Sequence, residues 1–504
     1  MGACNSAKTK DIKGNDPNKK EEEKSEEKKS EEKKSEEKKS EEKKSEEKKS
    51  DTLNINKNEE EKKEEIKEEE KNLNLNTKSK INFFTTNTSL LQTQNLKYFQ
   101  SKHSKENGEH IIMSFCDTFD IVDNFFYNLY YEHKLETNNP IYDYNKFFYF
   151  NNQTNTYKAR TIAVNLPNSQ YETFTNSKII DLYNQDNIIH KNQTQNLNDL
   201  KNENEEIEKK NDFIINFNND NYAASLNNLL RSEVEKCDNL RCIHFLGNIF
   251  NGESDGLLSS FLFEIQNDYN NVLRMAHLKY FDTYTHKAFN KIKNYIFTIS
   301  YLYDKCSLIN FFNTPFHADT LVNLTLGERI KEFYSDYNLN KILSDLLIDP
   351  AANFVYSNGC KINKPNSLDY YFDFLFADCK ENYSRSFVNK QISSLCIYKG
   401  NKILTEDEKI ILSNKMSKVV DLRLKNNKMY YNFYNINKEF QYDFISNFHQ
   451  TNYFKDFTEE YFMNFIQNYN ISNFTKEEKE NRNEAIMKVN DIMNYYKEIW
   501  KLVK

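Results

Sequence analysis

The residues with the clearest chemical potential lie in one stretch, His244 to Tyr269, which reads HFLGNIFNGESDGLLSSFLFEIQNDY. An apolar run leads into a loop with three glycines, and a long amphipathic segment follows. Glycine loops between a strand and a helix commonly bind phosphate, because backbone N–H groups and the helix dipole face the anion. Gly247, Gly252 and Gly256 are therefore candidate phosphate contacts.

Four other side chains in this loop oppose phosphate binding. Ile249 and Phe250 are bulky where close approach favours residues without a Cβ atom. Glu253 and Asp255 place two carboxylates where phosphate oxygens would lie, and like charges repel strongly in a partly buried site. We interpret the loop as a weakened site whose helix is capped by Ser254 and Asp255 in place of phosphate. A metal-assisted site built on the two acids is the alternative.

Alternating strands and helices are predicted to position this loop. We expect strands at 109–115, 158–166 and 241–246, and helices at 118–133, 226–240 and 255–269. This alternation is typical of an α/β protein with a parallel sheet, helices on both faces and a ligand crevice beyond the carboxyl ends of the strands.

The 504-residue chain has a net charge of -7, and its charges are unevenly distributed. The first 80 or so residues are mostly Lys, Glu, Ser and Asn, with SEEKK repeats from Ser25 to Ser50. A five-residue repeat without apolar positions offers no face for packing, so we predict a disordered, solvated spacer over 1–105. A partner-binding coiled coil is the alternative.

The sequence begins MGACNSAK, which resembles an acylation signal. Gly2 and Ser6 fit N-myristoylation, and Cys4 is placed for palmitoylation. Two acyl chains would give stable anchoring where one gives marginal affinity. Because no apolar run is long enough to cross a bilayer and no secretory signal is evident, we expect a cytoplasmic protein held at the cytosolic face of a membrane. A chance match to the signal is the alternative.

Eight cysteines and nine histidines are scattered along the chain. They form no CxxC motif and no metal-like pairing in sequence, which indicates a reduced intracellular protein with no metal cluster.

Several segments in the second part resemble the tubulin family, in the same order and with somewhat more likeness to beta-type tubulins. The segments are EHIIMSFCDTFDIVDNFFYNLYYEH, YKARTIAVNLPNS, IIDLYNQDNIIHKNQTQ, NNDNYAASLNNLLRSEVEKCDNL, the glycine loop, HKAFNKIKNYIFTISYLYDKCSLIN, DYNLNKILSDLL, LCIYKGNKILTEDE and the last forty or so residues. The resemblance implies a tubulin/FtsZ-like, Rossmann-type parallel sheet domain at 106–325, interrupted by an insertion near 197–212. It further implies an α+β intermediate domain at 326–455 and a C-terminal helical hairpin at 456–504.

The resemblance also implies a guanine-nucleotide site, of which only part is retained. Asn219, Asn221, Tyr222 and Asn310 match nucleoside contacts, with Asn310 expected at the start of the central helix. The glycine-rich run after the first strand is replaced by FCDTF, which carries Asp117, and the acids that help to hold magnesium are replaced by Asn165 and Pro167. We therefore expect weak or no binding of GTP or GDP.

Hydrolysis in the tubulin family uses an acid from the next subunit, and Asp345 lies at that position. An acid accelerates nothing without a phosphate cradle, so a surface Asp with no catalytic role is the alternative.

We predict a tubulin-like cytoskeletal pseudo-GTPase that associates with microtubules or tubulin-type assemblies; no nucleic-acid partner is expected. The main alternative is an acylated, membrane-tethered scaffold that keeps the fold without polymerising. The ending EIWKLVK lacks the acidic tail of tubulins, which weakens the expectation of a lattice subunit. The loop residues oppose an active GTPase, and LYNQDN and FNNDNYA favour tubulin over a Misato-like relative.

Overall fold

The computed structural model describes residues 97–99, 108–137, 142–191, 220–249, 251–279, 289–312, 316–331, 337–347, 349–362, 391–400, 430–437, 443–451 and 476–503, with scattered positions within 405–411 and 458–466. The chain divides into two compact units, Met1–Lys80 and Ile81–Lys504, and every described residue belongs to the second. The prediction of a disordered spacer over 1–105 is wrong at its end, because residues 97–99 are helical and Phe99 is buried in the core. The acylation residues Gly2 and Cys4, the SEEKK repeats and the insertion near 197–212 lie outside the described residues.

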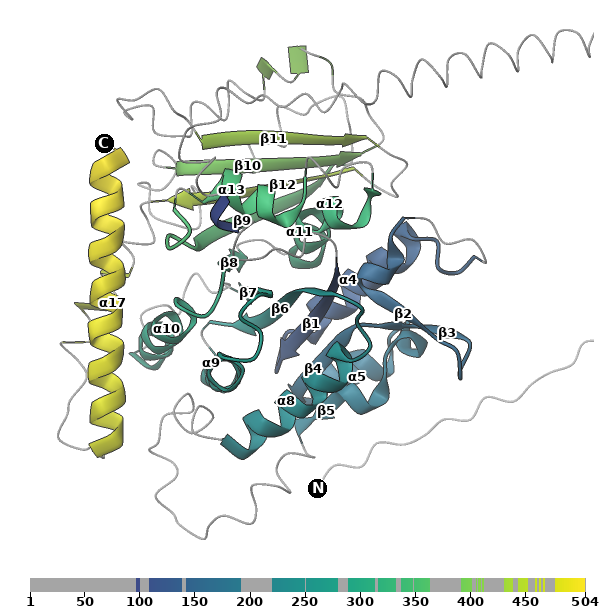
Figure 1. The fold of residues 1–504 in the computed structure, drawn as a ribbon, viewed down its shortest axis with the longest axis horizontal. Helices are drawn as coiled ribbons and strands as arrows, with labels where there is room; N and C mark the ends of the chain where they lie inside the picture. The colour runs from purple at the N-terminus through teal and green to yellow at the C-terminus, as the bar shows by residue number, and fades with distance from the viewer. Residues whose placement is uncertain are drawn as a thin grey trace, which may run out of the picture. The chain divides into compact units, whose positions relative to one another are not determined.

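A large, mostly parallel sheet organises the second unit (Figure 1). Its described strands are β1 (Glu109–Phe115), β4 (Thr161–Leu166), β5 (Ile188–His190), β6 (Leu240–Asn248), β7 (Leu273–Lys279), β8 (Leu308–Phe312), β9 (Phe354–Ile362), β10 (Gln391–Gly400), β11 (Tyr430–Asn437) and β12 (Asp443–Thr451). Their order is β11-β10-β12-β9-β8-β7-β6-β1-β4-β5. Only β12 among them runs antiparallel to its neighbours, β9 and β10. The predicted α/β class with a parallel sheet is confirmed in this coarse form.

Helices cover both faces of this sheet. One face packs against α8 (Asp220–Val234), α9 (Gly252–Glu264), α10 (Phe289–Leu302) and α17 (Lys476–Val503). The other packs against α4 (Phe119–Glu132), α5 (Asn168–Thr175), α11 (His317–Leu324), α12 (Leu326–Arg329) and α13 (Leu339–Leu346). Successive side chains of a strand point to opposite faces, so Ile111 and Met113 join the first core and Ile112 joins the second. Strands β1, β4 and β6 are buried almost throughout, as expected for a parallel sheet with two covered faces.

The predicted strand over 158–166 is divided into two strands. β3 (Thr156–Ala159) pairs antiparallel with β2 (Phe148–Asn151) in a separate hairpin, whereas β4 joins the main sheet. Arg160 lies at the break, where its backbone N–H donates to Phe147 and its guanidinium donates to the Lys236 carbonyl at 2.8 Å. The guanidinium thus fixes the corner that separates the two strands. Three short 3-10 turns complete this part: Tyr144–Lys146, Ile180–Leu182 and Gln185–Asn187.

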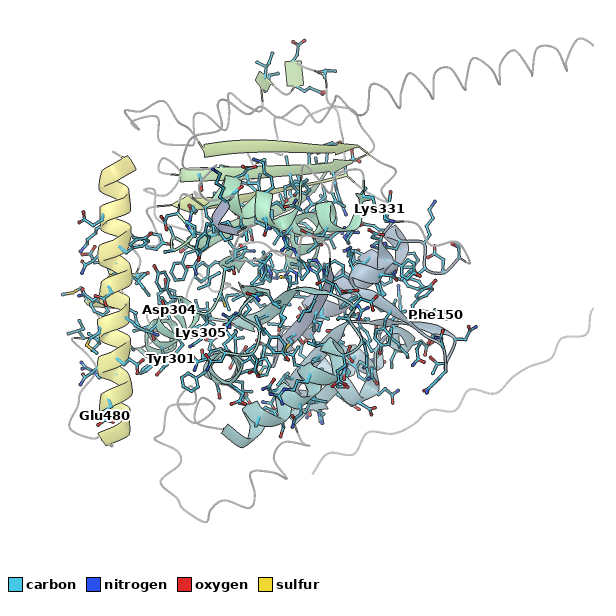
Figure 2. All side chains as sticks on the ribbon, viewed as in Figure 1. Phe150, Tyr301, Asp304, Lys305, Lys331 and Glu480 are labelled. Carbon is cyan, nitrogen blue, oxygen red and sulfur yellow. The ribbon has the colours of Figure 1, made fainter. Side chains whose placement is uncertain are left out.

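The long helix α17 packs against α10 in the first core (Figure 1). Figure 2 labels Tyr301, Asp304 and Lys305, which lie at and just after the C-terminal end of α10. Lys488 of α17 forms an ion pair with Asp304 at 3.1 Å, and the Tyr496 hydroxyl accepts a hydrogen bond from the Phe354 N–H. The predicted last helix of the chain is confirmed. Among the helices that the structure describes, none is long and apolar enough to cross a membrane.

A buried charge network connects the two halves of the sheet. The Glu132 carboxylate at the end of α4 accepts hydrogen bonds from Arg329 of α12, at 3.1 Å, and from Lys399 of β10. Arg329 also contacts the His133 ring at 3.2 Å. Burial opposes the charged form of Glu132, but Lys399 and Arg329 outweigh it and hold its pKa below the ordinary value. The predicted boundary between 325 and 326 falls beside this network, and the sheet continues across it; the domain division stays a prediction.

Candidate functional site

The glycine loop lies at the carboxyl edge of the sheet, where β1, β4 and β6 end side by side. These three strands are adjacent and parallel, so their carboxyl ends meet at one edge. The residues that leave two of them, Cys116 after β1 and Asn165 in β4, have positive φ angles of 55° and 56°. Non-glycine residues rarely adopt this conformation, and it is concentrated at binding sites and catalytic sites. The backbone therefore marks this edge as the place where a ligand site would be expected.

The N-terminus of α9 is capped by Asn251, whose side-chain oxygen accepts hydrogen bonds from the N–H groups of Glu253, at 3.1 Å, and Ser254, at 3.5 Å. The prediction that Ser254 and Asp255 cap this helix is wrong. An Asn immediately before the first helical residue reaches the N–H groups two and three residues on, which Ser254 and Asp255, inside the first turn, cannot do. The helix accordingly begins at Gly252, three residues earlier than predicted.

Glu253 places its carboxylate over this N-terminus and is matched by two donors. The side-chain amide of Asn165 donates to one oxygen at 2.6 Å, and the Lys191 ammonium contacts the other at 2.8 Å. A negative charge near a helix N-terminus is favourable. Glu253 thus supplies, from the chain itself, the charge that a bound phosphate would bring.

Asp117 supplies a second carboxylate at the same edge. Its two oxygens accept hydrogen bonds from the side-chain amides of Asn248, at 2.9 Å, and Asn251, at 3.5 Å. Both donors lie within the glycine loop, so these hydrogen bonds tie the loop to Asp117, which follows β1.

Ser254 and Asp255 lie beneath these acids, in the interior. The Ser254 hydroxyl donates to the Phe115 carbonyl at 3.3 Å and accepts from the Asn248 N–H at 3.1 Å. Asp255 is fully buried, and the Thr298 hydroxyl is its one nearby side-chain donor among the described residues. Burial raises the pKa of Asp255 well above its usual value, so the neutral acid is favoured. A neutral, enclosed acid is no metal ligand, which disfavours the metal-assisted alternative.

Of the three predicted phosphate glycines, Gly247 has a packing role. A Cβ atom at Gly247 would lie 3.1 Å from Leu258 and 3.4 Å from Leu278, so this glycine allows α9 to approach the sheet closely. Gly252 and Gly256 lie in the first two turns of α9, and both are buried. Ile249 is fully buried in the first core, and Phe250 lies outside the described residues.

Of the nucleoside contacts implied by the tubulin resemblance, the structure describes the side chains of Tyr222 and Asn310. Tyr222 is buried in the first core, where burial, Cys116 and Glu253 raise its pKa, so it lies near the carboxyl edge. Its hydroxyl has no hydrogen-bond partner among the described residues. Asn219 and the Asn221 side chain lie outside the described residues. Asn310 lies inside strand β8, not at the start of a helix as predicted, and is fully buried.

Asp345 lies on α13, and its carboxyl group is turned into the protein. It is 1% exposed and forms an ion pair with Lys341, one turn earlier, at 2.8 Å. A surface position, which both interpretations of this residue assume, is therefore not observed within the described chain. Its catalytic role stays a prediction.

A row of polar side chains crosses β1, β6, β7 and β8 on the face covered by α11 to α13. His110 Nδ1 lies 3.0 Å from His244 Nε2, His244 Nδ1 lies 3.0 Å from His277 Nε2, and His277 Nδ1 lies 3.5 Å from the Asn310 amide. All four residues are at most 1% exposed. Burial lowers the pKa of each histidine, that of His277 to about 3, so the rings are neutral near pH 7.

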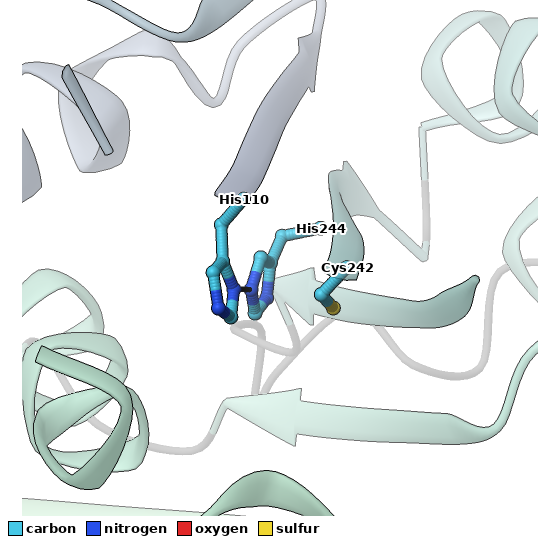
Figure 3. Close-up of side chains that lie close together, drawn as sticks. All are labelled: His110, Cys242 and His244. Atoms are coloured by element: carbon cyan, nitrogen blue, oxygen red, sulfur yellow. Dashed lines mark hydrogen bonds between the residues drawn. The ribbon is translucent and has the colours of Figure 1, made fainter. Parts of the chain in front are cut away.

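Cys242 joins two of these histidines in a group of potential metal ligands (Figure 3). One ligand-type atom from each of His110, Cys242 and His244 lies within 4.8 Å of the others. The sequence predicts no pairing of cysteine with histidine, because His110 is 134 residues from His244 and only the pairing of β1 with β6 brings them together. The Cys-x-His spacing of 242–244, which places both side chains on one face of a strand, is the only local signal.

Neither a scan against models of known protein families nor a search of the curated proteins finds a match to this chain. The tubulin resemblance therefore depends on the segments quoted above and on what the fold adds to them.

Proposed function

We propose that this chain is a divergent tubulin-like protein of the cytoskeleton, which joins or caps tubulin-type assemblies and holds GTP or GDP weakly or not at all. The proposal depends on the carboxyl edge of the sheet, where the acids Glu253 and Asp117 lie at the place that the tubulin resemblance assigns to phosphate. Both acids are bound by side chains of the same chain: Asn165, Lys191, Asn248 and Asn251.

The strand order supports a nucleotide-binding ancestry. Across the sheet, six of the strands lie in the order β5-β4-β1-β6-β7-β8. If these six are renumbered 1 to 6 along the chain, the order is 3-2-1-4-5-6, which is the doubly wound order. Ligands of such sheets bind at the carboxyl ends of the strands, beside the first strand. The glycine loop follows the fourth of these strands, at the point where the order reverses. The mixed strands β9 to β12 and the helix α17 agree with an intermediate domain and a final helix of the tubulin kind.

Two features argue against GTP turnover. No phosphate can approach the α9 N-terminus without displacing Glu253 from Asn165 and Lys191, and the two negative charges would repel each other. Asp345, the acid that would act on a neighbour's nucleotide, is buried and paired with Lys341. Interaction surfaces do not depend on turnover, so assembly with tubulin remains compatible with this chemistry.

The test is to purify the full chain, denature it, and measure released guanine nucleotide by chromatography, with tubulin as the positive control. We expect well below one nucleotide per chain. The double variant Asp117→Gly/Glu253→Gly, which removes both acids, should bind more guanine nucleotide than wild type, whereas Asp186→Gly, at an exposed acid of a neighbouring turn, should not. Stoichiometric GTP or GDP in the wild-type protein would contradict the proposal.

Co-sedimentation separates the two candidate functions. The cytoskeletal function predicts enrichment with microtubules, and the chain should pellet with them in the absence of lipid. The membrane-tethered scaffold is favoured by the MGAC start, with Gly2 and Cys4 as the acylated residues. Binding to membranes that is lost in Gly2→Ala, together with no enrichment on microtubules, would replace the first function with the second.

A further inference from the structure

We propose that His110, Cys242 and His244 form a site for one zinc ion, with His110 Nδ1, His244 Nε2 and the Cys242 thiolate as ligands. The site lies on the sheet face covered by α11 to α13, over the neighbouring strands β1 and β6, and is distinct from the carboxyl edge (Figure 3). It is independent of the tubulin proposal.

The two nitrogens are already spaced for a shared metal. They lie 3.0 Å apart, and two nitrogens bound tetrahedrally to zinc at about 2.0 Å each are separated by about 3.3 Å. The hydrogen bond between the rings would open by a few tenths of an ångström. Cys242 is the register partner of His110 on the adjacent strand and lies two residues from His244 on the same strand face, so its sulfur lies within 4.8 Å of a nitrogen of each ring.

The nitrogens that would not bind the metal have partners of the kind that orient metal-bound histidines. His110 Nε2 lies 3.8 Å from Glu328 Oε2, and neither atom has a hydrogen-bond partner among the described residues. The other Glu328 oxygen accepts from the Leu339 N–H at 2.6 Å, which fixes the carboxylate. Zinc on His110 Nδ1 places the proton on Nε2, so the ring would donate to Glu328 and satisfy both atoms.

The other members of the histidine row, His277 and Asn310, can form hydrogen bonds that match the protonation of the metal-bound rings. Zinc on His244 Nε2 leaves the proton on Nδ1, which donates to His277 Nε2; the His277 proton then lies on Nδ1, facing Asn310. Asn310 Oδ1 has no hydrogen-bond partner among the described residues. A half-turn of the Asn310 amide gives that oxygen the His277 proton, so the metal-bound row leaves no ring nitrogen unmatched.

Charge and ligand type favour zinc. A thiolate with two imidazoles suits zinc, whereas magnesium and calcium prefer oxygen ligands. The negative charges of the Cys242 thiolate and the Glu328 carboxylate together equal the charge of a divalent ion. Arg241 and Lys146 add positive charge near His110, so both negative charges are needed to stabilise the ion. Three protein ligands leave the fourth position to a water molecule. All three ligands are fully buried, so we expect slow exchange and a structural role.

The experiment uses the full chain, purified without a polyhistidine tag, in three forms: wild type, Cys242→Ser and His244→Ala. Elemental analysis should find about one zinc per wild-type chain and much less in both variants. After removal of zinc, Co²⁺ should give visible bands typical of tetrahedral cobalt and a near-ultraviolet thiolate-to-cobalt band. Cys242→Ser should abolish the thiolate band. Cys396→Ser is the matched control, because Cys396 is also a buried strand cysteine and lies outside the group.

The positioning role of Glu328 gives a second test. Glu328→Gln keeps an acceptor for the Leu339 N–H but weakens the acceptor for His110, so zinc affinity should fall about 10-fold to 100-fold. Circular dichroism with a chelator present shows whether each variant remains folded. No zinc in the wild-type protein together with no cobalt bands on titration would overturn the proposal, as would equal zinc content in folded Cys242→Ser and wild type.

Discussion

Two carboxylates, Glu253 at the carboxyl edge and Glu132 in the interior, each bind two partners in very different surroundings. The Glu253 and Lys191 side chains are 26% and 38% exposed, whereas Glu132, Arg329 and Lys399 are at most 4% exposed. Water can solvate the charges of the first group if a partner is lost. It cannot do so in the second, where a missing partner leaves an uncompensated buried charge. A change of charge at the edge should therefore have little consequence for the fold, while the interior network is part of what holds the two halves of the sheet together.

The largest expected effect comes from breaking the interior network. Glu132→Gln keeps the shape of the side chain but leaves Arg329 and Lys399 without their shared negative charge. We expect the free energy of unfolding to fall by about 3 to 5 kcal/mol, measured by urea denaturation followed by circular dichroism.

Glu253→Gln is the matched control for this change. It should alter the free energy of unfolding by no more than about 1 kcal/mol, because its partner Lys191 stays in contact with water. Similar losses in the two variants would contradict the contrast between edge and interior.

The sequence predicted the elements around the edge better than the contacts within it. Alternation of apolar strands and amphipathic helices gave β1, α4 and β6 nearly to the residue, and the two strands stand out because both of their faces are buried. The helix predicted at 226–240 has the wrong bounds, because α8 covers Asp220–Val234 and begins within the segment interpreted as a nucleotide loop. The break at Arg160 was missed, since it depends on a guanidinium bond to the Lys236 carbonyl, 76 residues away. The cap was misassigned because Asn251, Ser254 and Asp255 are all capping types, and only the backbone selects among them.

The candidate sites show the same limit. Glu253 and Asp255 look equivalent in sequence, yet Glu253 is partly exposed and paired with Lys191, whereas Asp255 is fully buried and has no ion pair among the described residues. The histidine row depends entirely on strand register, since His110, His244 and His277 come from three different strands. Residues this far apart in the sequence form no local motif, so only the pairing of the strands brings them together.

Two buried groups, Asp255 beneath the carboxyl edge and His277 in the histidine row, should respond to pH with opposite signs. Asp255 has a raised pKa, so the folded state keeps a proton that the unfolded chain loses above about pH 4, and stability falls as pH rises. His277 has a pKa of about 3, so the unfolded chain binds a proton below about pH 6.5 that the folded state refuses, and stability falls as pH decreases. Each group contributes a slope of up to about 1.4 kcal/mol per pH unit within its own range.

Melting temperatures at pH 5 and pH 8 measure the two responses. The melting temperature of Asp255→Asn, relative to that of wild type, should be higher at pH 8 than at pH 5, because the variant removes the cost of protonating the acid. The melting temperature of His277→Gln, relative to that of wild type, should be higher at pH 5 than at pH 8, because the variant removes the cost of keeping the ring neutral. The measurements should be made with a chelator, so that metal binding does not contribute. An equal shift at both pH values in either variant would show that the group does not titrate as described.

The smallest expected effect is at Lys191, and it sharpens the comparison. Lys191→Ala removes the only cation that the described structure places on Glu253, yet the side-chain amide of Asn165 remains bound to the same carboxylate. Because both charged side chains reach water, the free energy of unfolding should fall by less than about 1 kcal/mol, and the loss should shrink further in high salt. A loss as large as that of Glu132→Gln would mean that Lys191 and Glu253 form a structural pair. A small loss would mean that the carboxyl edge, unlike the interior, is free to exchange one anion for another.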